Sequence, residues 1–313
     1  MTDTMVAVIG AGQVGGACAQ RILERGLANV ALIDVAEGLA KGKALDLSQA
    51  SSIEGYDSKI IGGADFSLME DSKAVIVTAG LARKPGMTRE DLLLQNARII
   101  KPIVDNIRRY CPHSIIIMVT NPLDVMTYLA YKVSGFEKNR VIGMAGVLDS
   151  ARLRFFISDK LKVASSGIEA MVLGGHGDSM VALIGHTKIN GRPIEEFLSE
   201  EEIGGLIQRT RDGGAEVVSL LKTGSAYYAP SSAACEMLEC ILKDTKKILP
   251  VSACLSGEYG LNDVYCGVPA RLGAKGIDDI VELKLSDKEL SELRESANQV
   301  KESVEYLRRS DLI

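Results

Sequence analysis

The chain has 313 residues, which suits about two domains and a substantial core. Its 36 Lys and Arg against 41 Asp and Glu give a net charge of −5, and this mild acidity argues against a nucleic-acid partner. No apolar stretch is long enough for a membrane helix, and residues 1–5 lack the basic start of a targeting signal, so we expect a cytoplasmic protein with no membrane partner. The six cysteines form no Cys-x-x-Cys pair, which favours buried reduced thiols and no metal site.

The first 145 residues alternate continuous apolar runs with helical patterns. Runs without polar alternation are typical of parallel strands that are buried on both faces. The predicted strands are 6–9, 30–33, 74–77 and 115–119, and the helical patterns lie near 14–26, 37–49, 90–109 and 123–133. This alternation predicts a doubly wound parallel sheet of the Rossmann type over residues 1–145.

The pattern changes over residues 146–313, for which we predict an α+β substrate domain with mixed or antiparallel strands. In this part Asn190-Gly191 indicates a hairpin turn, and Ser286 with Glu289 matches a capping box at the start of the last helix. The first predicted helix begins near Asp149, and the others cover about 200–222, 231–245 and the segment after Ser286. The predicted strands lie near 170–173, 181–184, 248–255 and 264–269.

A glycine motif follows the first predicted strand directly, in the order Gly10, Ala11, Gly12, Gln13, Val14, Gly15. Such a turn between a strand and a helix binds the pyrophosphate of a dinucleotide through main-chain N–H groups. Asp34, at the end of the second predicted strand, is placed to accept hydrogen bonds from ribose hydroxyls and to repel a 2′-phosphate. We therefore predict NAD as the cofactor, with simple capping of the following helix as the alternative role of Asp34.

His176 is the histidine whose setting best suits acid–base chemistry, because it lies between glycines directly after an apolar run. Asp149 and Arg152 are three residues apart at the start of a predicted helix, so they share one face. Asp149 is suited to orient an imidazole, and Arg152 to bind a carboxylate. The alternatives are a structural histidine and a surface ion pair. His113 and His186 are interpreted as structural.

The segment 80–89 carries three cations, Arg83, Lys84 and Arg89, around a Pro-Gly turn. It follows the third predicted strand, at the edge of the sheet where doubly wound folds bind ligands. This pattern predicts a loop that closes over an anionic substrate, with a solvated loop as the alternative.

Together these motifs resemble the lactate/malate dehydrogenase family over essentially the whole chain and, within it, the bacterial malate dehydrogenases that are similar to lactate dehydrogenases. The segments that carry the resemblance are 10–15, 78–80, 82–89, 120–122, 148–152 and 175–178.

The resemblance implies a role for each matching residue. His176 would be the proton acceptor, Asp149 its partner and Arg152 the ligand of the substrate's 1-carboxylate, while Arg89 would polarise the reacting carbonyl. Asn121, after a cis bond to Pro122, would contact substrate and nicotinamide ribose. Further cofactor contacts would come from Asn96, Val119 and Thr120.

Arg83 would select the substrate, because the lactate enzymes of the family carry Gln there and a guanidinium pairs with the second carboxylate of oxaloacetate. Ala226, another pocket position, would leave room for it. The resemblance thus implies an NAD-dependent enzyme that interconverts (S)-malate and oxaloacetate in the tricarboxylic acid cycle, and a homo-oligomer, with a tetramer favoured over a dimer. The alternatives are a dehydrogenase of lactate or another 2-hydroxy acid, an NAD- and metal-dependent glycosidase, and a non-catalytic NAD sensor.

Overall fold

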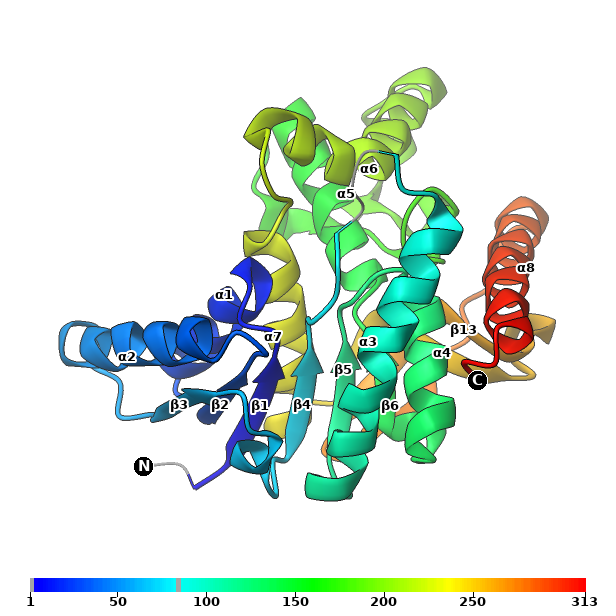
Figure 1. The fold of residues 1–313 in the computed structure, drawn as a ribbon. Helices are drawn as coiled ribbons and strands as arrows, with labels where there is room; N and C mark the ends of the chain where they lie inside the picture. Colours follow the sequence, from blue (N-terminus) through cyan, green and yellow to red (C-terminus); the bar gives the residue numbers. More distant parts are fainter. Residues whose placement is uncertain (1–2, 83–85) are drawn as a thin grey trace.

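The computed structural model describes residues 3–82 and 86–313. Its N-terminal part is a parallel sheet in the strand order β3-β2-β1-β4-β5-β6 (Figure 1). The elements of this part are β1 (Met5–Ile9), α1 (Gln13–Glu24), β2 (Asn29–Ile33), α2 (Glu37–Glu54), β3 (Ile60–Gly63), β4 (Ala74–Val77), α3 (Arg89–Tyr110), β5 (Ile115–Met118), α4 (Leu123–Ser134) and β6 (Val141–Gly143).

The strands after β6 continue the same sheet with antiparallel pairing, in the order β6-β12-β13-β8-β9, and β14 pairs with β13. A separate small sheet holds β11, β10 and β7. The elements are α5 (Gly146–Leu161), β7 (Ile168–Glu169), β8 (Val172–Gly174), β9 (Met180–Ala182), β10 (Lys188–Ile189), β11 (Arg192–Pro193), α6 (Glu200–Leu221), α7 (Tyr228–Leu242), β12 (Lys247–Ser256), β13 (Asn262–Gly273), β14 (Gly276–Ile280) and α8 (Asp287–Arg309). Short 3₁₀ turns cover Phe66–Met69, Lys138–Arg140, Ser165–Gly167, Ile184–His186, Ile194–Glu196 and Glu258–Gly260.

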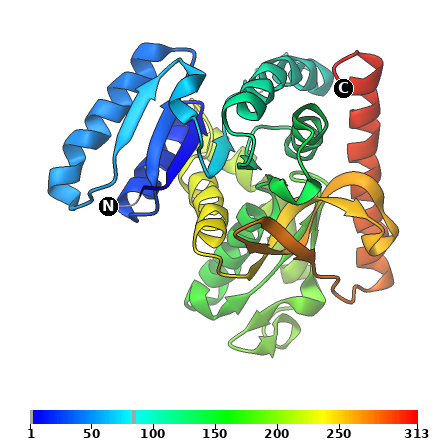
Figure 2. The same cartoon turned by 90° about the horizontal axis from the view of Figure 1, so that it is seen from below.

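The predicted α/β architecture is confirmed, with a doubly wound parallel sheet followed by an α+β part. The order of the parallel strands reverses between β1 and β4, so the chain leaves these two strands in opposite directions and opens a crevice at their carboxyl ends. Right-handed crossovers put α1 and α2 on one face of the sheet and α3 and α4 on the other. Figure 2 shows α1 and α2 at the opposite side of the molecule from α8.

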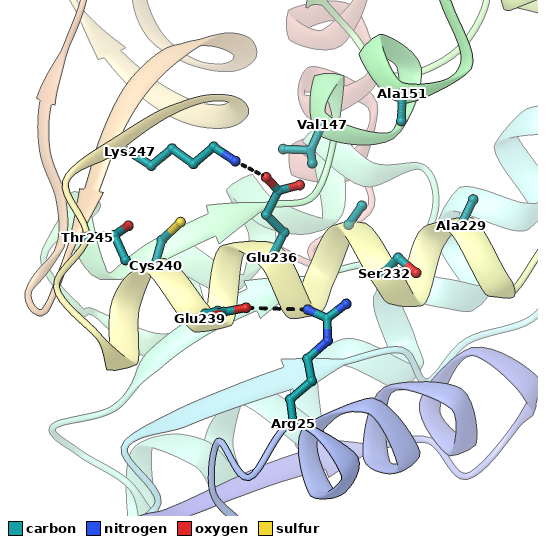
Figure 3. A pocket seen from close by; sticks show the side chains of 11 residues that line it. Arg25, Val147, Ala151, Ala229, Ser232, Glu236, Glu239, Cys240, Thr245 and Lys247 are labelled. Carbon is teal, nitrogen blue, oxygen red and sulfur yellow. Dashed lines mark hydrogen bonds and ion pairs between the residues drawn. The ribbon is translucent and has the colours of Figure 1, made fainter. Parts of the chain in front are cut away.

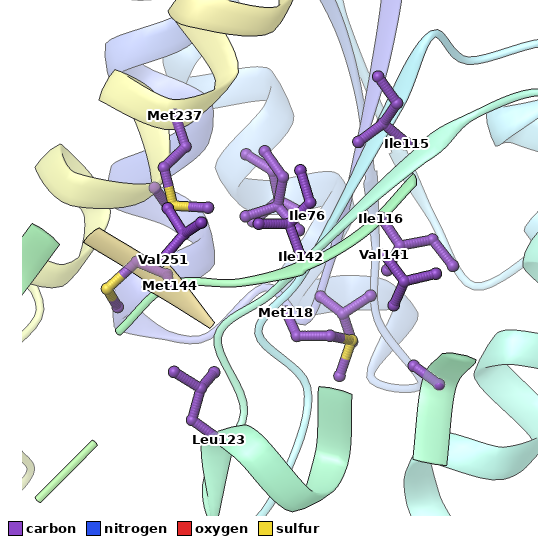
Figure 4. Close-up of a cluster of buried hydrophobic side chains, with 14 of the residues drawn as sticks. Ile76, Ile115, Ile116, Met118, Leu123, Val141, Ile142, Met144, Met237 and Val251 are labelled. Atoms are coloured by element: carbon purple, nitrogen blue, oxygen red, sulfur yellow. The ribbon is translucent and has the colours of Figure 1, made fainter. Parts of the chain in front are cut away.

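The main core lies along the middle of the sheet. Ile76, Ile116 and Ile142 come from adjacent strands and have no exposed surface. Met237 of α7 and Val251 of β12 pack beside them (Figure 4). Burying such a side chain contributes about 1.5–3 kcal/mol, so this layer holds the parallel and antiparallel parts of the sheet together. A second buried cluster lies between α5, α6 and β7 to β10.

Three details differ from the sequence-based prediction. Six strands were not predicted, because they are short and lack a long apolar run: β3, β6, β7, β10, β11 and β14. Helix α5 begins at Gly146 rather than near Asp149, and Gly146 packs closely against the main chain, because a Cβ there would lie 2.2 Å from the Val172 oxygen. The strand predicted at 181–184 ends at Ala182, where a 3₁₀ turn follows. The predicted turn at Asn190-Gly191 joins β10 to β11, and the capping box at Ser286 is present.

No helix in the described part of the chain is both long and apolar enough to cross a bilayer. All six cysteines are unpaired and buried, as predicted.

Candidate active site

The glycine motif forms the turn from β1 into α1, and each glycine meets a different steric demand. Gly10 has φ +102°, and a Cβ there would lie 2.7 Å from the nitrogen of Ala79. A Cβ on Gly15 would lie 1.8 Å from the oxygen of Gly10, whereas a Cβ on Gly12 would meet no atom within 4 Å. The turn is therefore tight at Gly10, packed at Gly15 and open at Gly12, which is the arrangement that a pyrophosphate-binding turn requires.

The first turn of α1 has free donors, because its N-cap residue Gly12 provides no side-chain hydrogen bond. Ala11 and Gln13 lie beside this residue, and the side chain of Val14 lines the cavity described below. A phosphate bound at this end of the helix would meet N–H groups and the positive end of the helix dipole. The residues present therefore fit a dinucleotide.

Asp34 follows β2 and fixes the glycine turn from the side. Its Oδ2 accepts the N–H of Ala11 at 2.6 Å, and its Oδ1 accepts the N–H of Ala36 at 2.8 Å. The second bond lies in the turn before α2, whose N-cap residue Ala36 has no side-chain cap, so the alternative of Asp34 as a cap of α2 is not supported. The first bond fixes the glycine turn. Binding of ribose hydroxyls by Asp34 stays a prediction.

A buried hydrogen-bond cluster holds the ends of β4 and β5 together. Asn96 has no exposed surface: its Oδ1 accepts the N–H of Leu81 at 2.7 Å, and its Nδ2 donates to the oxygen of Asn121 at 2.6 Å. Thr120 Oγ1 donates to the oxygen of Ala79 at 2.6 Å. Asn96 therefore fixes the main chain on both sides of the crevice, and its direct contact with a cofactor stays a prediction.

The bond from Asn121 to Pro122 is cis, as predicted. Asn121 and the neighbouring Val119 both line the cavity that contains His176. The predicted cofactor-contact residues after β5 thus lie at the edge of the substrate cavity.

His176, Asp149 and Arg152 form a continuous hydrogen-bonded chain. His176 Nδ1 is 2.8 Å from Asp149 Oδ2, and Arg152 Nη1 is 3.2 Å from Asp149 Oδ1. The Asp149 side chain is only 4% exposed, so the alternative of a surface ion pair is wrong for it. Asp149 holds the imidazole with Nδ1 turned toward itself, so Nε2 is the ring nitrogen that remains for another partner.

The environment favours the protonated form of His176. Burial by itself lowers the pKa of the imidazole, but the charge of Asp149 and the hydrogen bond to it outweigh burial, so the pKa lies above its ordinary value. Arg152 works against this shift and Asp124 supports it. A base with this environment takes up a proton readily and is stable as the imidazolium.

A cavity of about 380 Å³ opens over these side chains. The predicted residues that it brings together are His176, Asp149, Arg152 and Asn121, with Ala226 in the wall. Its size suits a small acid beside part of a cofactor.

Arg89 lies in an adjoining cavity of about 540 Å³ that shares Asn121 and His176 with the first. Its Nη2 is 2.6 Å from Asp178 Oδ2, and both side chains are largely exposed. The structure thus places Arg89 beside His176 but pairs it with Asp178. Arg83 and Lys84 lie outside the described residues.

Sequence reasoning missed two groups that border the cavity. Arg211 of α6 lines it and donates to the oxygen of Met180 at 3.4 Å, and its buried Nε has no hydrogen-bond partner among the described residues. Gly213 lets Arg152 lie close to α6, since a Cβ there would be 3.2 Å from Arg152 Cδ. The local sequence of α6 offers only one hint of these contacts, namely that Arg211 lies close to Gly213 and Gly214. This pattern does not predict which side chain packs against the glycines.

Asp124 of α4 was also missed. Its Oδ2 accepts the main-chain N–H of His176 at 2.9 Å, and its Oδ1 accepts the Ser252 hydroxyl at 2.6 Å. Nothing in the local sequence distinguishes it from an acid that caps a helix. Within the described residues, no group of three or more His, Cys, Asp and Glu is placed to hold a metal ion.

Two family models match the chain. One, described as the lactate/malate dehydrogenase NAD binding domain, matches residues 4–143, and the other, described as the lactate/malate dehydrogenase alpha/beta C-terminal domain, matches residues 146–309. Among the curated relatives, a malate dehydrogenase of Chlorobium limicola is 52% identical over 96% of this chain and 98% of its own length. A malate dehydrogenase of Methanosarcina barkeri is 50% identical with the same coverage.

Solved structures of malate dehydrogenases and of lactate dehydrogenases share the fold. A malate dehydrogenase from Cryptosporidium parvum superposes with a TM-score of 0.96 at 40% identity, over 98% of this chain and all of that one. A lactate dehydrogenase from the same organism, complexed with lactic acid and NAD, superposes with a TM-score of 0.95 at 42% identity, over 98% and 99% of the two chains. The fold alone therefore does not separate the two substrates.

Proposed function

Because the chain belongs to the lactate/malate dehydrogenase family and is thus an NAD-dependent oxidoreductase, we propose that it interconverts (S)-malate and oxaloacetate. The family and the cofactor predicted from the sequence are confirmed. The observation that carries the catalytic proposal is the His176–Asp149–Arg152 chain at the wall of a small cavity. It supplies a base, the carboxylate that orients it and a carboxylate-binding cation in one place.

The proposed binding of NAD uses residues 10–15 for the pyrophosphate and Asp34 for the adenosine ribose. Asn96, Val119, Thr120 and Asn121 would lie along the nicotinamide end. When bound, NAD takes up the hydride that leaves C2 of malate. The division into a cofactor-binding part, residues 1–145, and a substrate part, residues 146–313, belongs to the same proposal.

In the proposed mechanism Arg152 binds the 1-carboxylate and so turns the substrate hydroxyl toward His176. Nε2 of His176 takes the hydroxyl proton, and the Asp149 carboxylate stabilises the imidazolium that forms. In the opposite direction the imidazolium returns this proton to the carbonyl oxygen. Arg89, released from Asp178, would help to stabilise negative charge on that oxygen.

Selection of malate over lactate would rest on Arg83, which pairs with the second carboxylate of the substrate. With pyruvate the guanidinium would have no partner inside the closed site, and such an unpaired group rejects a substrate by roughly 10⁴-fold. The curated relatives named malate dehydrogenase support this choice, and Ala226 leaves space for the larger substrate.

We also propose that the chain forms a homo-oligomer, with a tetramer favoured over a dimer. Helix α2 carries Leu45 and Ile53 on its outer side, and they are 62% and 85% exposed. A groove of about 590 Å³ runs beside α7, where Glu239 pairs with Arg25 and Glu236 pairs with Lys247 (Figure 3). Exposed apolar side chains such as Leu45 and Ile53 support a contact with another subunit, whereas the groove beside α7 has a mixed lining of charged and apolar side chains. Sedimentation at several concentrations tests the assembly, and a stable monomer would contradict it.

A cytoplasmic location and a role in the tricarboxylic acid cycle complete the proposal. The direct test compares kcat/KM for oxaloacetate and pyruvate with NADH, followed by NADPH in place of NADH. We expect strong preference for oxaloacetate and for NADH. Comparable rates with pyruvate would favour a dehydrogenase for other 2-hydroxy acids, and binding of NADH without turnover would favour the sensor alternative.

A further inference from the structure

The buried acid Asp124 stands directly behind the catalytic histidine. It lies in the first turn of α4, three residues after Asn121, and is 4% exposed. One carboxylate oxygen accepts the N–H of His176 from the loop after β8, and the other accepts the hydroxyl of Ser252 from β12. One side chain therefore links the segment that carries Asn121 to the loop that carries His176.

Hydrogen bonding alone does not explain a carboxylate at this position. An asparagine could accept the N–H of His176 through its oxygen, and the Ser252 hydroxyl could accept from its amide. Burying a negative charge costs free energy, and none of the ion pairs among the described residues includes Asp124. A charge retained at this cost next to a base that becomes positive in the reaction indicates an electrostatic role.

We propose that Asp124 is a second positioning acid: it fixes the main chain of His176, and its negative charge stabilises the imidazolium that forms when Nε2 takes the substrate proton. The inference rests on the proposed function. Asp149 acts on the imidazole ring, and Asp124 acts on the main chain and through space. The two acids thus hold the histidine from different elements, α5 and α4.

Other charged groups also face His176. Asp149 and Arg152 approach from α5, Arg211 lines the cavity from α6, and the adjoining cavity contributes Arg89, Asp178 and Glu302. Burial lowers the pKa of His176, Asp149 raises it, Arg152 lowers it and Asp124 raises it.

The carboxyl of Asp124 responds to its own surroundings. Burial is the strongest influence and lifts the pKa of Asp124 above its ordinary value, although the Ser252 hydroxyl and the His176 N–H oppose this shift by stabilising the charged form. Both of its oxygens accept hydrogen bonds from donors, as an ionised carboxylate does. Loss of its charge must therefore lower the pKa of His176.

The decisive experiment is a titration of the histidines of the full chain by NMR, in the wild type and in Asp124→Asn. The chain has only three histidines, and His176→Asn assigns the relevant signal. His113 is exposed and the His186 ring contacts the oxygen of Lys284, so these two serve as internal controls. We expect the titration of His176 to move to lower pH in Asp124→Asn, with His113 and His186 unchanged.

Ser252→Ala is the matched control, because it removes one hydrogen bond from the same carboxylate and keeps the charge. It should move the His176 titration much less than Asp124→Asn does. An unchanged His176 titration in folded Asp124→Asn, or equal shifts in the two variants, would overturn the proposal. If Asp124→Asn does not fold, Asp124→Ser, which is smaller and also uncharged, must give the same downward shift.

Kinetics give a second readout. Reduction of oxaloacetate needs the protonated imidazole, so the alkaline fall of its kcat/KM should move to lower pH in Asp124→Asn, with a loss of roughly tenfold on that limb. The Kd of NADH should not change. Because the titration needs no turnover, a chain that does not reduce oxaloacetate but shows the shift would contradict the proposed function alone.

Discussion

Two glycine-flanked turns dominate the functional part of this molecule, and they are built on the same principle. The turn after β1 is held by Asp34, which accepts the N–H of Ala11, and the turn after β8 is held by Asp124, which accepts the N–H of His176. In both, a carboxylate from another element fixes the main chain of a loop at the end of a buried strand. The first turn presents main-chain N–H groups, whereas the second presents one side chain.

This difference determines how much of each site comes from residues that are close together in the sequence. The β1 turn, α1 and Asp34 lie within one strand–helix–strand unit, so their spacing along the chain is set by the fold of that unit. The environment of His176 comes from α4, α5 and β12, which lie far apart in the sequence. A main-chain site therefore tolerates changes of side chain except where a Cβ would meet the chain or the bound phosphate, while a side-chain site depends on each of its partners.

The largest effect should follow from replacing the side chain that the second turn presents. His176→Asn removes the proton acceptor and should lower kcat for oxaloacetate by about 10³-fold, within the range of general acid–base catalysis. The first turn should be unaffected, so the Kd of NADH, measured by fluorescence, should stay within about twofold of the wild type. Near-normal turnover in His176→Asn would contradict the role of His176 as the proton acceptor.

Substitution of Arg83 tests whether the side-chain site is completed by the loop that carries this residue. Arg83→Gln should cut the preference for oxaloacetate over pyruvate by roughly 10³-fold, because the second carboxylate loses its partner. Lys84→Gln is the matched control: it removes a cation from the adjacent position of the same loop. If both variants change the preference equally, Arg83 acts through general charge and does not select the substrate.

Two glycine variants break the first turn in separable ways. Gly15→Ala puts a Cβ 1.8 Å from the Gly10 oxygen, so α1 must shift, and we expect a loss of about 1–3 kcal/mol in the free energy of unfolding. Gly12→Ala meets no protein atom within 4 Å and should cost less stability. It should nevertheless weaken NADH binding by roughly tenfold or more, because a phosphate approaches there. Denaturant unfolding and NADH titration separate the two; unchanged NADH binding in Gly12→Ala would place the phosphates elsewhere.

The sequence predicts most of the fold because its long strands are unbroken apolar runs and its long helices carry clear periodicity. Residues 60–63 and 276–280 were missed, because they are short strands at the edges of the sheet where neighbouring strands, not composition, determine the conformation. The beginning of α5 was placed near Asp149, whereas the helix begins at Gly146, where the lack of a Cβ allows a close contact with the main chain of β8.

The candidate site was predicted where chemistry and spacing coincide, as for His176 with Asp149 and Arg152. Asp124, Arg211 and Ser252 could not be predicted. Their contacts depend on how α4, α6 and β12 pack around the turn after β8, and each taken alone is an ordinary helix acid, helix cation or buried serine. The family resemblance did not predict these three residues either, because it implies roles only for residues within the matching motifs.

The smallest expected effect concerns the carboxylate that holds the first turn. Asp34→Ser removes the negative charge that would repel a 2′-phosphate, and it also removes the acceptor of the Ala11 N–H. We expect the preference of kcat/KM for NADH over NADPH to fall by roughly tenfold, about 1.4 kcal/mol. Asp34→Asn is the matched control, since its amide oxygen can still accept that N–H while the charge is gone. A fall in both variants assigns the discrimination to the charge of Asp34, whereas a fall in Asp34→Ser alone assigns it to the loosened turn. If neither variant changes the preference, Asp34 acts only on the main chain, as Asp124 would if its own charge had no effect on His176.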